Sequence, residues 1–279
     1  MSLALSPSLP AVRIAANGIA YADMGGSGPA LVFIHGVGLD HTMWAGQVAA
    51  FSPRWRVILP DMPGHGASAN PASDATLDDY AAAIDGLMAE LGVTRAVLVG
   101  FSMGALVARA LALRHPAWLS AMVLLNGVFD RAPAVSTAIA DRVAEVVRGG
   151  PAANVDAALE RWFTPEYHRD RPQAIAALRV AVAGNDPAGY LTTYRLFATQ
   201  DNYGADRLGE IDLPVLVATG EHDVGSTPAM AQALAARIAG AQCAILANAR
   251  HMMPVEHAAE TNALLAPFIE ANFAPSTGA

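Results

Sequence analysis

Lysine is absent from this sequence, and all 17 basic residues are arginines. The absence excludes reactions that need a lysine amine, such as Schiff-base formation or a Ser-Lys pair. It also excludes the phosphate-binding loop that depends on a lysine. A single cysteine, Cys243, cannot form a disulfide within the chain. Charged residues make up only 15% of the chain and the net charge is −8, so we expect no nucleic-acid partner.

Long apolar runs and a basic leader are also missing. No run of about 18 apolar residues occurs, so we expect no membrane span. Residues 1–7 lack the basic start and apolar centre of a signal peptide. Together with the lone cysteine, this predicts a cytoplasmic protein. The sequence has no HExxH motif and no Cys/His cluster, so we expect no metal ion, and we expect no cofactor.

What the sequence does contain is 53% hydrophobic residues over 279 positions, enough for a large core. Short apolar runs alternate with segments of helical spacing, and Asp74 is the predicted cap of the first long helix. The pattern predicts a mostly parallel eight-stranded sheet with helices on both faces. The predicted strands are 12–16, 19–23, 30–34, 56–59, 96–99, 121–125, 214–219 and 242–246. The predicted helices are 76–91, 105–113, 136–147, 155–162, 172–182, 187–199, 228–238 and 258–272.

The alternation of strands and helices stops between residues 128 and 209, where only helical patterns occur. We therefore expect residues 1–127 and 210–279 to form an α/β core domain. Residues 128–209 are expected to form a helical cap domain inserted into it.

Gly100-Phe101-Ser102-Met103-Gly104 lies between a predicted strand and a predicted helix. A serine flanked two residues away by glycines at such a junction is typical of a nucleophile elbow. The glycines allow the helix backbone to pass close to the strand. The pentapeptide alone is also compatible with Ser102 as an ordinary helix N-cap.

A serine nucleophile needs a base, and the base needs a carboxylate that orients it. Asp223 and His251 follow the last two predicted strands, in the chain order serine, acid, histidine that accompanies such an elbow. The carboxyl ends of parallel strands meet at one edge of a sheet, so the three side chains are expected to converge. Rival acids are Glu221, Asp212 and Asp130, and a rival base is His222.

An oxyanion site is predicted beside the serine. His35-Gly36-Val37-Gly38 follows the strand 30–34, and its backbone can point an N–H group at the developing charge. The expected donors are the backbone N–H groups of Val37 and Met103.

Five segments together resemble the α/β-hydrolase fold superfamily over nearly the whole chain. They are His35-Gly36 with Trp44, residues 61–68, residues 100–104, residues 220–223, and His251. The chain is similar to 3-oxoadipate enol-lactonase-like hydrolases and small carboxylesterases. The resemblance implies an α/β-hydrolase fold with a helical cap, and a serine hydrolase that cleaves a carboxylic ester or lactone through an acyl-enzyme.

Three other activities are compatible with the same resemblance. One is hydrolysis of a carbon–carbon bond in ring-cleavage products, although those relatives usually carry Asn where this chain has Phe101. Another is a cofactor-free perhydrolase or haloperoxidase-like activity. The third is a hydrolase-fold binding protein without catalysis. Dehalogenases and epoxide hydrolases carry an aspartate nucleophile where this chain has Ser102.

The expected partner is a small ester or lactone, and nothing in the sequence predicts an oligomeric state. Trp162 and Phe129 of the cap, and Met252 beside His251, are the predicted substrate contacts. Arginines of the cap are candidates to bind a substrate carboxylate, although solvation is the ordinary role of such a residue. These candidates are Arg131, Arg161, Arg169, Arg179 and Arg195.

Overall fold

The computed structural model describes residues 9–26 and 28–273. The expectation about a signal peptide concerns residues 1–7, which lie outside the described residues. Within the described part, one eight-stranded sheet has the order β1-β2-β4-β3-β5-β6-β7-β8. The strands are β1 (Arg13–Ile14), β2 (Ala20–Asp23), β3 (Ala30–Ile34), β4 (Arg56–Pro60), β5 (Ala96–Phe101), β6 (Leu119–Leu125), β7 (Val215–Gly220) and β8 (Gln242–Leu246).

The sheet is parallel except at one edge. β1 pairs with β2 and β2 with β4 in antiparallel fashion, and every later pairing is parallel. Every residue of β3 and β5 is buried, as expected for parallel strands that are covered on both faces. The predicted mostly parallel eight-stranded sheet is confirmed.

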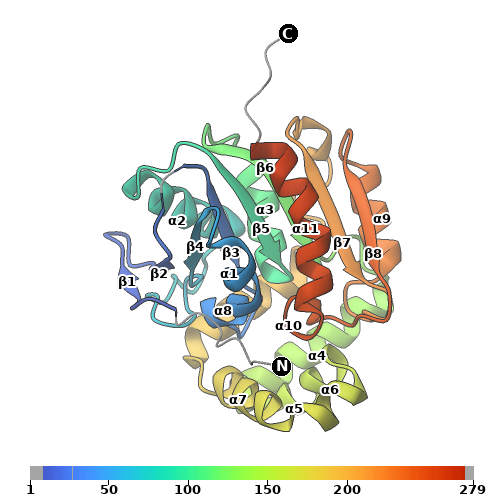
Figure 1. The fold of residues 1–279 in the computed structure, drawn as a ribbon. Coiled ribbons are helices and arrows are strands. Elements are labelled where there is room, and N and C mark those ends of the chain that lie inside the picture. Colours follow the sequence, from blue (N-terminus) through green and yellow to red (C-terminus); the bar gives the residue numbers. More distant parts are fainter. Residues whose placement is uncertain (1–8, 27, 274–279) are drawn as a thin grey trace.

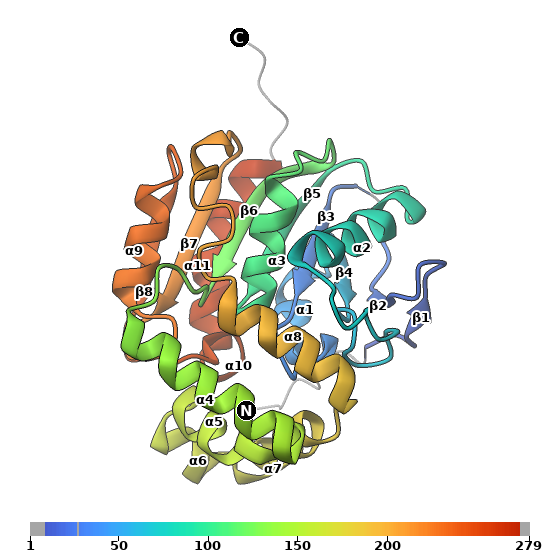
Figure 2. The same cartoon turned by 180° about the vertical axis from the view of Figure 1, so that it is seen from behind.

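Helices cover both faces of this sheet. Figures 1 and 2 show α1 and α11 on one face and α2, α3 and α9 on the other. The α-helices are α1 (Ala45–Phe51), α2 (Leu77–Glu90), α3 (Met103–Ala112), α4 (Pro133–Gly149), α5 (Val155–Trp162), α6 (Pro165–Asp170), α7 (Pro172–Ala183), α8 (Pro187–Thr199), α9 (Pro228–Ala236), α10 (Met253–Glu256) and α11 (Ala258–Phe273). Single turns of 3-10 helix are η1 (His41–Trp44), η2 (Pro151–Asn154) and η3 (Leu208–Glu210).

Five helices, α4 to α8, separate β6 from β7 in the chain. Figure 1 shows α4 to α7 together at the lower end of the molecule, beyond the carboxyl ends of the strands. Proline stands in the first turn of α4, α6, α7 and α8, where its missing N–H costs no helical hydrogen bond. These helices make up the segment predicted as a cap; its status as a separate domain stays a prediction.

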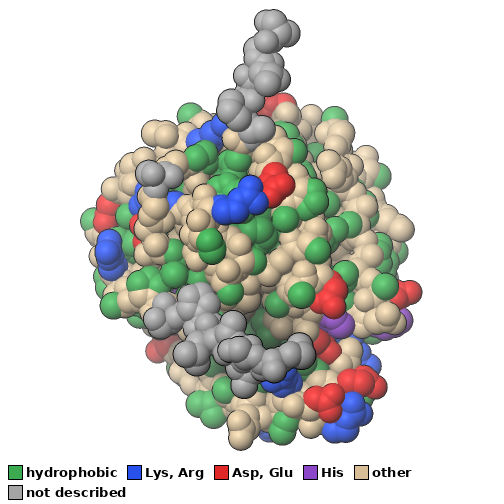
Figure 3. Space-filling view, viewed as in Figure 1, with side chains coloured by type: hydrophobic (Ala, Val, Ile, Leu, Met, Phe, Trp, Pro, Cys, Tyr) green, Lys and Arg blue, Asp and Glu red, His purple; other side chains and the backbone are tan. Residues whose placement is uncertain are grey.

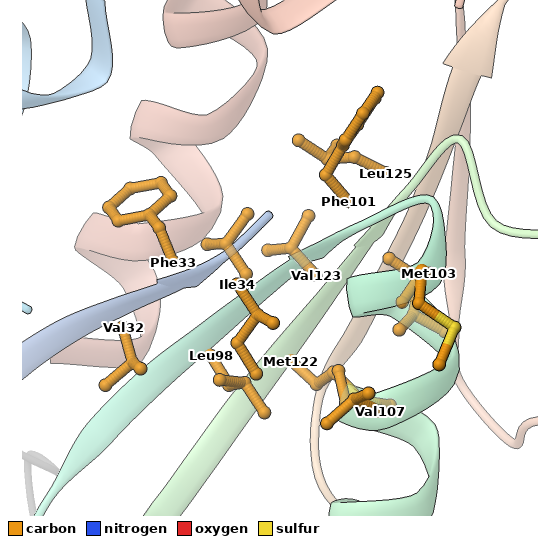
Figure 4. Packing of buried hydrophobic residues seen from close by; sticks show 14 of the residues in the cluster. Val32, Phe33, Ile34, Leu98, Phe101, Met103, Val107, Met122, Val123 and Leu125 are labelled. Atoms are coloured by element: carbon orange, nitrogen blue, oxygen red, sulfur yellow. The ribbon is translucent and has the colours of Figure 1, made fainter. Parts of the chain in front are cut away.

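Buried side chains pack on both faces of β3, β5 and β6, and α3 covers one of these faces. Figure 4 shows their side chains together with Met103 and Val107 of α3, and each labelled side chain is at most 1% exposed. Side chains such as Phe33 and Ile34 bury large apolar areas, each burial contributing about 1.5–3 kcal/mol. This rigid packing holds the ends of β3 and β5, which carry the loops of the candidate site.

Two local predictions were wrong. Asp74 does not cap α2; the N-cap is Thr76, whose Oγ1 accepts from the Asp79 N–H while Asp79 Oδ2 accepts from the Thr76 N–H. This reciprocal pair satisfies two free N–H groups at once, which a lone aspartate further upstream cannot do. The strand expected over 12–16 is shorter, with only Arg13–Ile14 paired to β2.

None of the described helices is long and apolar enough to span a membrane. The face in Figure 3 is covered mainly by hydrophobic and uncharged side chains, with arginine and acidic side chains close together at its lower right. That appearance agrees with the low share of charged residues in the sequence.

Candidate active site

The turn between β5 and α3 holds Ser102 in a strained conformation. Its φ of 54° and ψ of −112° lie where side chains other than glycine are rarely found. A Cβ added at Gly100 would collide with the backbone of Gly104, and one at Gly104 would collide with the carbonyl of Ile34. The two glycines therefore permit the close crossing of strand and helix that this turn requires.

The side chain of Ser102 points to His251 and not along α3. Ser102 occupies the N-cap position of α3, but its side chain makes no capping hydrogen bond to the helix, so it is not an ordinary N-cap serine. Ser102 Oγ lies 3.1 Å from His251 Nε2, and His251 Nδ1 lies 2.7 Å from Asp223 Oδ2. A carboxylate only accepts hydrogen bonds, so Nδ1 carries the imidazole proton and Nε2 is left to accept from the serine hydroxyl.

Asp223 is almost completely buried, at 3% exposed, and is held as a carboxylate. Its Oδ1 accepts from the N–H groups of Gly225 and Ser226, and its Oδ2 accepts from His251 and from Asn126 Nδ2. Burial favours the neutral acid, but the neighbouring His251 and these hydrogen bonds outweigh burial and lower the pKa of Asp223. The group is therefore charged and fixed in orientation.

The rival acids and the rival base lie outside this arrangement. Glu221, Asp212, Asp130 and His222 are all exposed. Glu221 instead accepts a hydrogen bond from the backbone N–H of Asn248. Asp223 is thus the carboxylate that contacts His251.

The loop after β3 lies directly beside Ser102. A Cβ at Gly36 would approach the Cβ of Ser102 to 3.2 Å. Within the described residues, the backbone N–H groups of Val37 and Met103 donate to no protein acceptor. Met103 is the first residue of α3, where a helix leaves its N–H groups unsatisfied and favours negative charge.

Two buried histidines fix that loop. Nε2 of His35 accepts from the Met62 N–H, and Nε2 of His65 accepts from the Gly38 N–H, each over 2.9 Å. Burial lowers the pKa of His35 and lowers that of His65 to about 3. Both rings are neutral and their nitrogens are occupied, whereas His251 Nε2 lies beside the hydroxyl of Ser102.

A pocket opens from Ser102 and His251 toward the helices α4, α5 and α8. Its wall on the helical side includes Arg142, Arg161, Trp162, Tyr190 and Tyr194. Its wall on the sheet side includes Val37, Asp223 and the loop 224–226. A small molecule with an apolar body and a polar group is the kind of ligand that such a lining suits.

Comparison with known proteins identifies the family. A sequence model described as alpha/beta hydrolase fold matches residues 29–258. The chain belongs to the alpha/beta hydrolase fold family.

This hydrolase is similar to two curated proteins of Acinetobacter baylyi. It is 33% identical over 247 residues to (E)-2-((N-methylformamido)methylene)succinate hydrolase, covering 88% of this chain and 92% of the relative. It is 31% identical over 230 residues to 3-oxoadipate enol-lactonase 2, covering 82% and 84%. Among solved structures, the enol-lactonase from Burkholderia xenovorans LB400 aligns with a TM-score of 0.83 and 33% identity, covering 91% of this chain and 98% of that one. The predicted resemblance to enol-lactonase-like hydrolases is confirmed.

The hydrolase pocket contains one of the three predicted substrate contacts. Trp162 lines it, while Phe129 and Met252 do not. The guanidinium of Arg109 lies 5.8 Å from the centre of the Phe129 ring, and Met252, the residue after His251, is fully buried. Neither is placed to contact a substrate in this pocket, because each completes the core beneath it.

Of the five candidate arginines, only Arg161 lines the pocket of the hydrolase. Arg142 was missed by the sequence reasoning. Val135, Ile139 and Arg142 share the pocket-facing side of α4 at a spacing of four and three residues. That spacing is the signal which would have placed Arg142 on the face of Ile139.

The loop of His251 is bonded to the end of α5. The Met252 N–H donates to the Trp162 carbonyl over 3.0 Å, and Arg250 Nη1 donates to the Phe163 carbonyl over 3.0 Å. The His251 ring lies 6.1 Å from the Trp162 ring and 5.0 Å from the Phe101 ring. These contacts fix the imidazole and the pocket wall in one arrangement. Among the described residues, no group of three His, Cys, Asp or Glu side chains is placed to hold a metal ion.

Proposed function

We propose that this protein is a serine hydrolase that cleaves a small carboxylic ester or lactone, with Ser102 as nucleophile, His251 as base and Asp223 as the orienting acid. The observation that carries the proposal is the continuous hydrogen-bonded chain from Ser102 Oγ through His251 to Asp223 at the end of a pocket. The similarity to proteins named enol-lactonases supports the lactone and ester class.

In the first half of the reaction, Ser102 Oγ attacks the substrate carbonyl carbon as its proton passes to His251 Nε2. The carbonyl oxygen becomes an oxyanion. Collapse of this intermediate breaks the bond to the leaving oxygen, and His251 Nε2 donates to that oxygen the proton that it received from Ser102. The alcohol departs from an ester, whereas in a lactone the new hydroxyl stays attached to the acyl group.

In the second half, water attacks the acyl-enzyme and gives one proton to His251 Nε2. Collapse returns that proton to Ser102 Oγ and releases the carboxylic acid, so one water is consumed for each bond cleaved. The ionised Asp223 stabilises the imidazolium formed in each half. The N–H groups of Val37 and Met103 are the proposed oxyanion donors, each worth about 3 kcal/mol in the transition state.

The test is p-nitrophenyl acetate hydrolysis together with labelling by a fluorophosphonate probe. Wild type should hydrolyse the ester and take the label, and Ser102→Ala should lose at least about a thousandfold in kcat and all of the label. Ser52→Ala, at the end of α1, is the matched control and should behave as wild type. Turnover that persists in Ser102→Ala would refute the mechanism. Absence of both turnover and label in wild type would point to a binding protein without catalysis.

A second candidate function is hydrolysis of a bond other than that of a simple ester or lactone, and it rests on one comparison. The relative with 33% identity is named for hydrolysis of a formamido-substituted methylene succinate, so related chains act beyond enol-lactones. The same serine, histidine and oxyanion donors serve carbon–carbon hydrolysis of ring-cleavage products, and peracid formation when peroxide replaces water. Two assays separate ester or lactone hydrolysis, carbon–carbon hydrolysis and peracid formation. The first compares lactones and short esters with vinylogous diketo acids, and the second measures bromination with acetate and peroxide. Highest kcat/KM on an ester or lactone is the result expected.

A further inference from the structure

We infer that the substrate of this pocket carries a carboxylate remote from the bond that is cleaved, and that Arg142 and Arg161 bind it. The inference rests on the proposed function, because it names the substrate class of the same site.

Arg142 and Arg161 come from different helices, α4 and α5, and line the same pocket as Ser102 and His251. Within the described residues, neither guanidinium lies within ion-pair distance of a carboxylate, whereas Arg179 on the neighbouring α7 is paired with Asp156. Arg142 Nε donates only to the Ala138 carbonyl of its own helix. Glu145 and Glu160, whose charges act on Arg161, are exposed, and Asp223, which lines the same pocket, is already bonded to His251 and Asn126.

A third guanidinium lies behind this wall. The Arg131 side chain is fully buried, packs over the Phe197 ring at 4.6 Å, and donates to the Phe197 carbonyl. Its Nε and Nη2 have no hydrogen-bond partner among the described residues. Asp201, 3.7 Å away, is the carboxylate that faces Arg131. Phe197 itself lines the pocket, so the buried Arg131 lies directly behind a wall that also carries Arg142 and Arg161.

Such a concentration of like charges is costly for the folded protein. Burial and the neighbouring Arg142 lower the pKa of Arg161, which means that the site disfavours its charged form. The chain as a whole carries a net charge of −8, so the positively charged arginines of this wall are opposite in sign to the molecule as a whole. An anionic ligand group would relieve the repulsion and satisfy the donors.

The lining favours a carboxylate on a short chain. Guanidinium groups offer planar pairs of N–H donors that match the two oxygens of a carboxylate. The walls of the same pocket also include Trp162, Tyr190 and Tyr194, which suit an apolar acyl chain. A half-ester or lactone of a dicarboxylic acid presents its carbonyl to Ser102 and its free carboxylate to the arginines.

The first test compares two esters with the same acyl length, phenyl hexanoate and the monophenyl ester of adipic acid, by the release of phenol. Wild type should favour the adipate ester by at least about tenfold in kcat/KM, as expected for charge-assisted hydrogen bonds. In Arg142→Gln and Arg161→Gln that preference should fall about tenfold, mainly through KM. Arg148→Gln, an exposed arginine on the same α4, is the matched control and should keep it.

The second test does not depend on catalysis. Monomethyl adipate and methyl hexanoate, which differ by the free carboxylate, are titrated calorimetrically into Ser102→Ala protein. Monomethyl adipate should bind at least about tenfold more tightly, with the difference lost when Arg142→Gln or Arg161→Gln is added. If hydrolysis fails but this difference is present, the proposed function is wrong and the carboxylate site stands. Equal kcat/KM on the two phenyl esters, together with equal binding of the two methyl esters when both arginines are intact, would overturn the inference. So would substitutions that reduce both members of each pair in parallel.

Discussion

Asn126 and His251 donate to the same oxygen of Asp223: the distances to Oδ2 are 2.9 Å from Asn126 Nδ2 and 2.7 Å from His251 Nδ1. Asn126 ends β6 with a φ of 50°, a conformation that asparagine tolerates better than most residues. This chain thus places an uncharged donor just after one strand and the proposed acid just after the next.

Replacing Asn126 with glycine should lower kcat/KM about tenfold. Glycine accepts the positive φ but removes a donor to a buried carboxylate, a loss of about 1–3 kcal/mol. The measurement is steady-state hydrolysis of p-nitrophenyl acetate. Asn202→Gly, in the exposed loop after α8, is the control. Wild-type kinetics in Asn126→Gly would show that the amide does not help to hold Asp223 for catalysis.

Gly104→Ala should destabilise the fold by about 3 kcal/mol or more, because its Cβ would collide with the backbone carbonyl of Ile34. Gly209→Ala is a matched control: no atom lies within 4 Å of the Cβ position, and its φ is not positive. Urea unfolding followed by circular dichroism compares the two. Equal stability of both variants would mean that the approach of α3 to the end of β3 is looser than described.

Ser102→Gly should be more stable than Ser102→Ala by about 1 kcal/mol, although a protein with alanine at a given position is normally more stable than one with glycine. Alanine retains the strain of a φ of 54°, which costs about 1–3 kcal/mol, and glycine releases it. Ala181→Gly, at an exposed position of α7, should show the ordinary order, with glycine less stable by about 1 kcal/mol. Thermal unfolding of wild type, Ser102→Gly, Ser102→Ala and Ala181→Gly measures these differences. A Ser102→Ala protein more stable than Ser102→Gly would contradict the prediction.

Stability should fall as pH drops below about 6.5, with His65 as one cause. Burial lowers the pKa of His65 from 6.5 to about 3, so in this range the unfolded chain binds a proton that the folded chain does not. The free energy of unfolding then decreases by up to about 1.4 kcal/mol per pH unit for each such histidine. Urea unfolding at pH 7 and pH 5.5 measures the slope.

His65→Gln should reduce that slope, because glutamine can accept from the Gly38 N–H without titrating. His115→Asn, which removes an exposed histidine with a φ of 52°, should leave the slope as in wild type. An unchanged slope in His65→Gln would mean that His65 takes up its proton in the folded state as readily as in the unfolded chain.

The strands were predictable because the sheet is buried on both faces, so each strand stands out as a short apolar run between turn residues. Gln242–Leu246 is β8 as predicted, and Ala30–Ile34 is β3 as predicted. Helices α1, α6 and α10 were missed because each is short and relies on tertiary contacts more than on its own periodicity. The cap at Asp74 failed for a similar reason, since a reciprocal pair two residues later competes with it.

The convergence of Ser102, Asp223 and His251 followed from chain order and from the geometry of parallel strand ends. No comparable rule of chain order or strand geometry predicts which residues form the pocket wall. Helical spacing marks which residues share a face, but it does not say whether that face meets the core or the pocket. Phe129 and Met252 were therefore assigned to the substrate although they pack elsewhere, and Arg142 was passed over.

The hydrogen bond from Met252 to Trp162 and those from Arg250 to the end of α5 join the loop of His251 to the helix that bounds the pocket. In the proposed mechanism, the pocket wall that limits substrate size and the base are therefore joined. A ligand too bulky for the space beside Trp162 has to displace this wall together with the segment that carries the imidazole. We therefore expect oversized substrates to react more slowly in the chemical step as well as to bind more weakly.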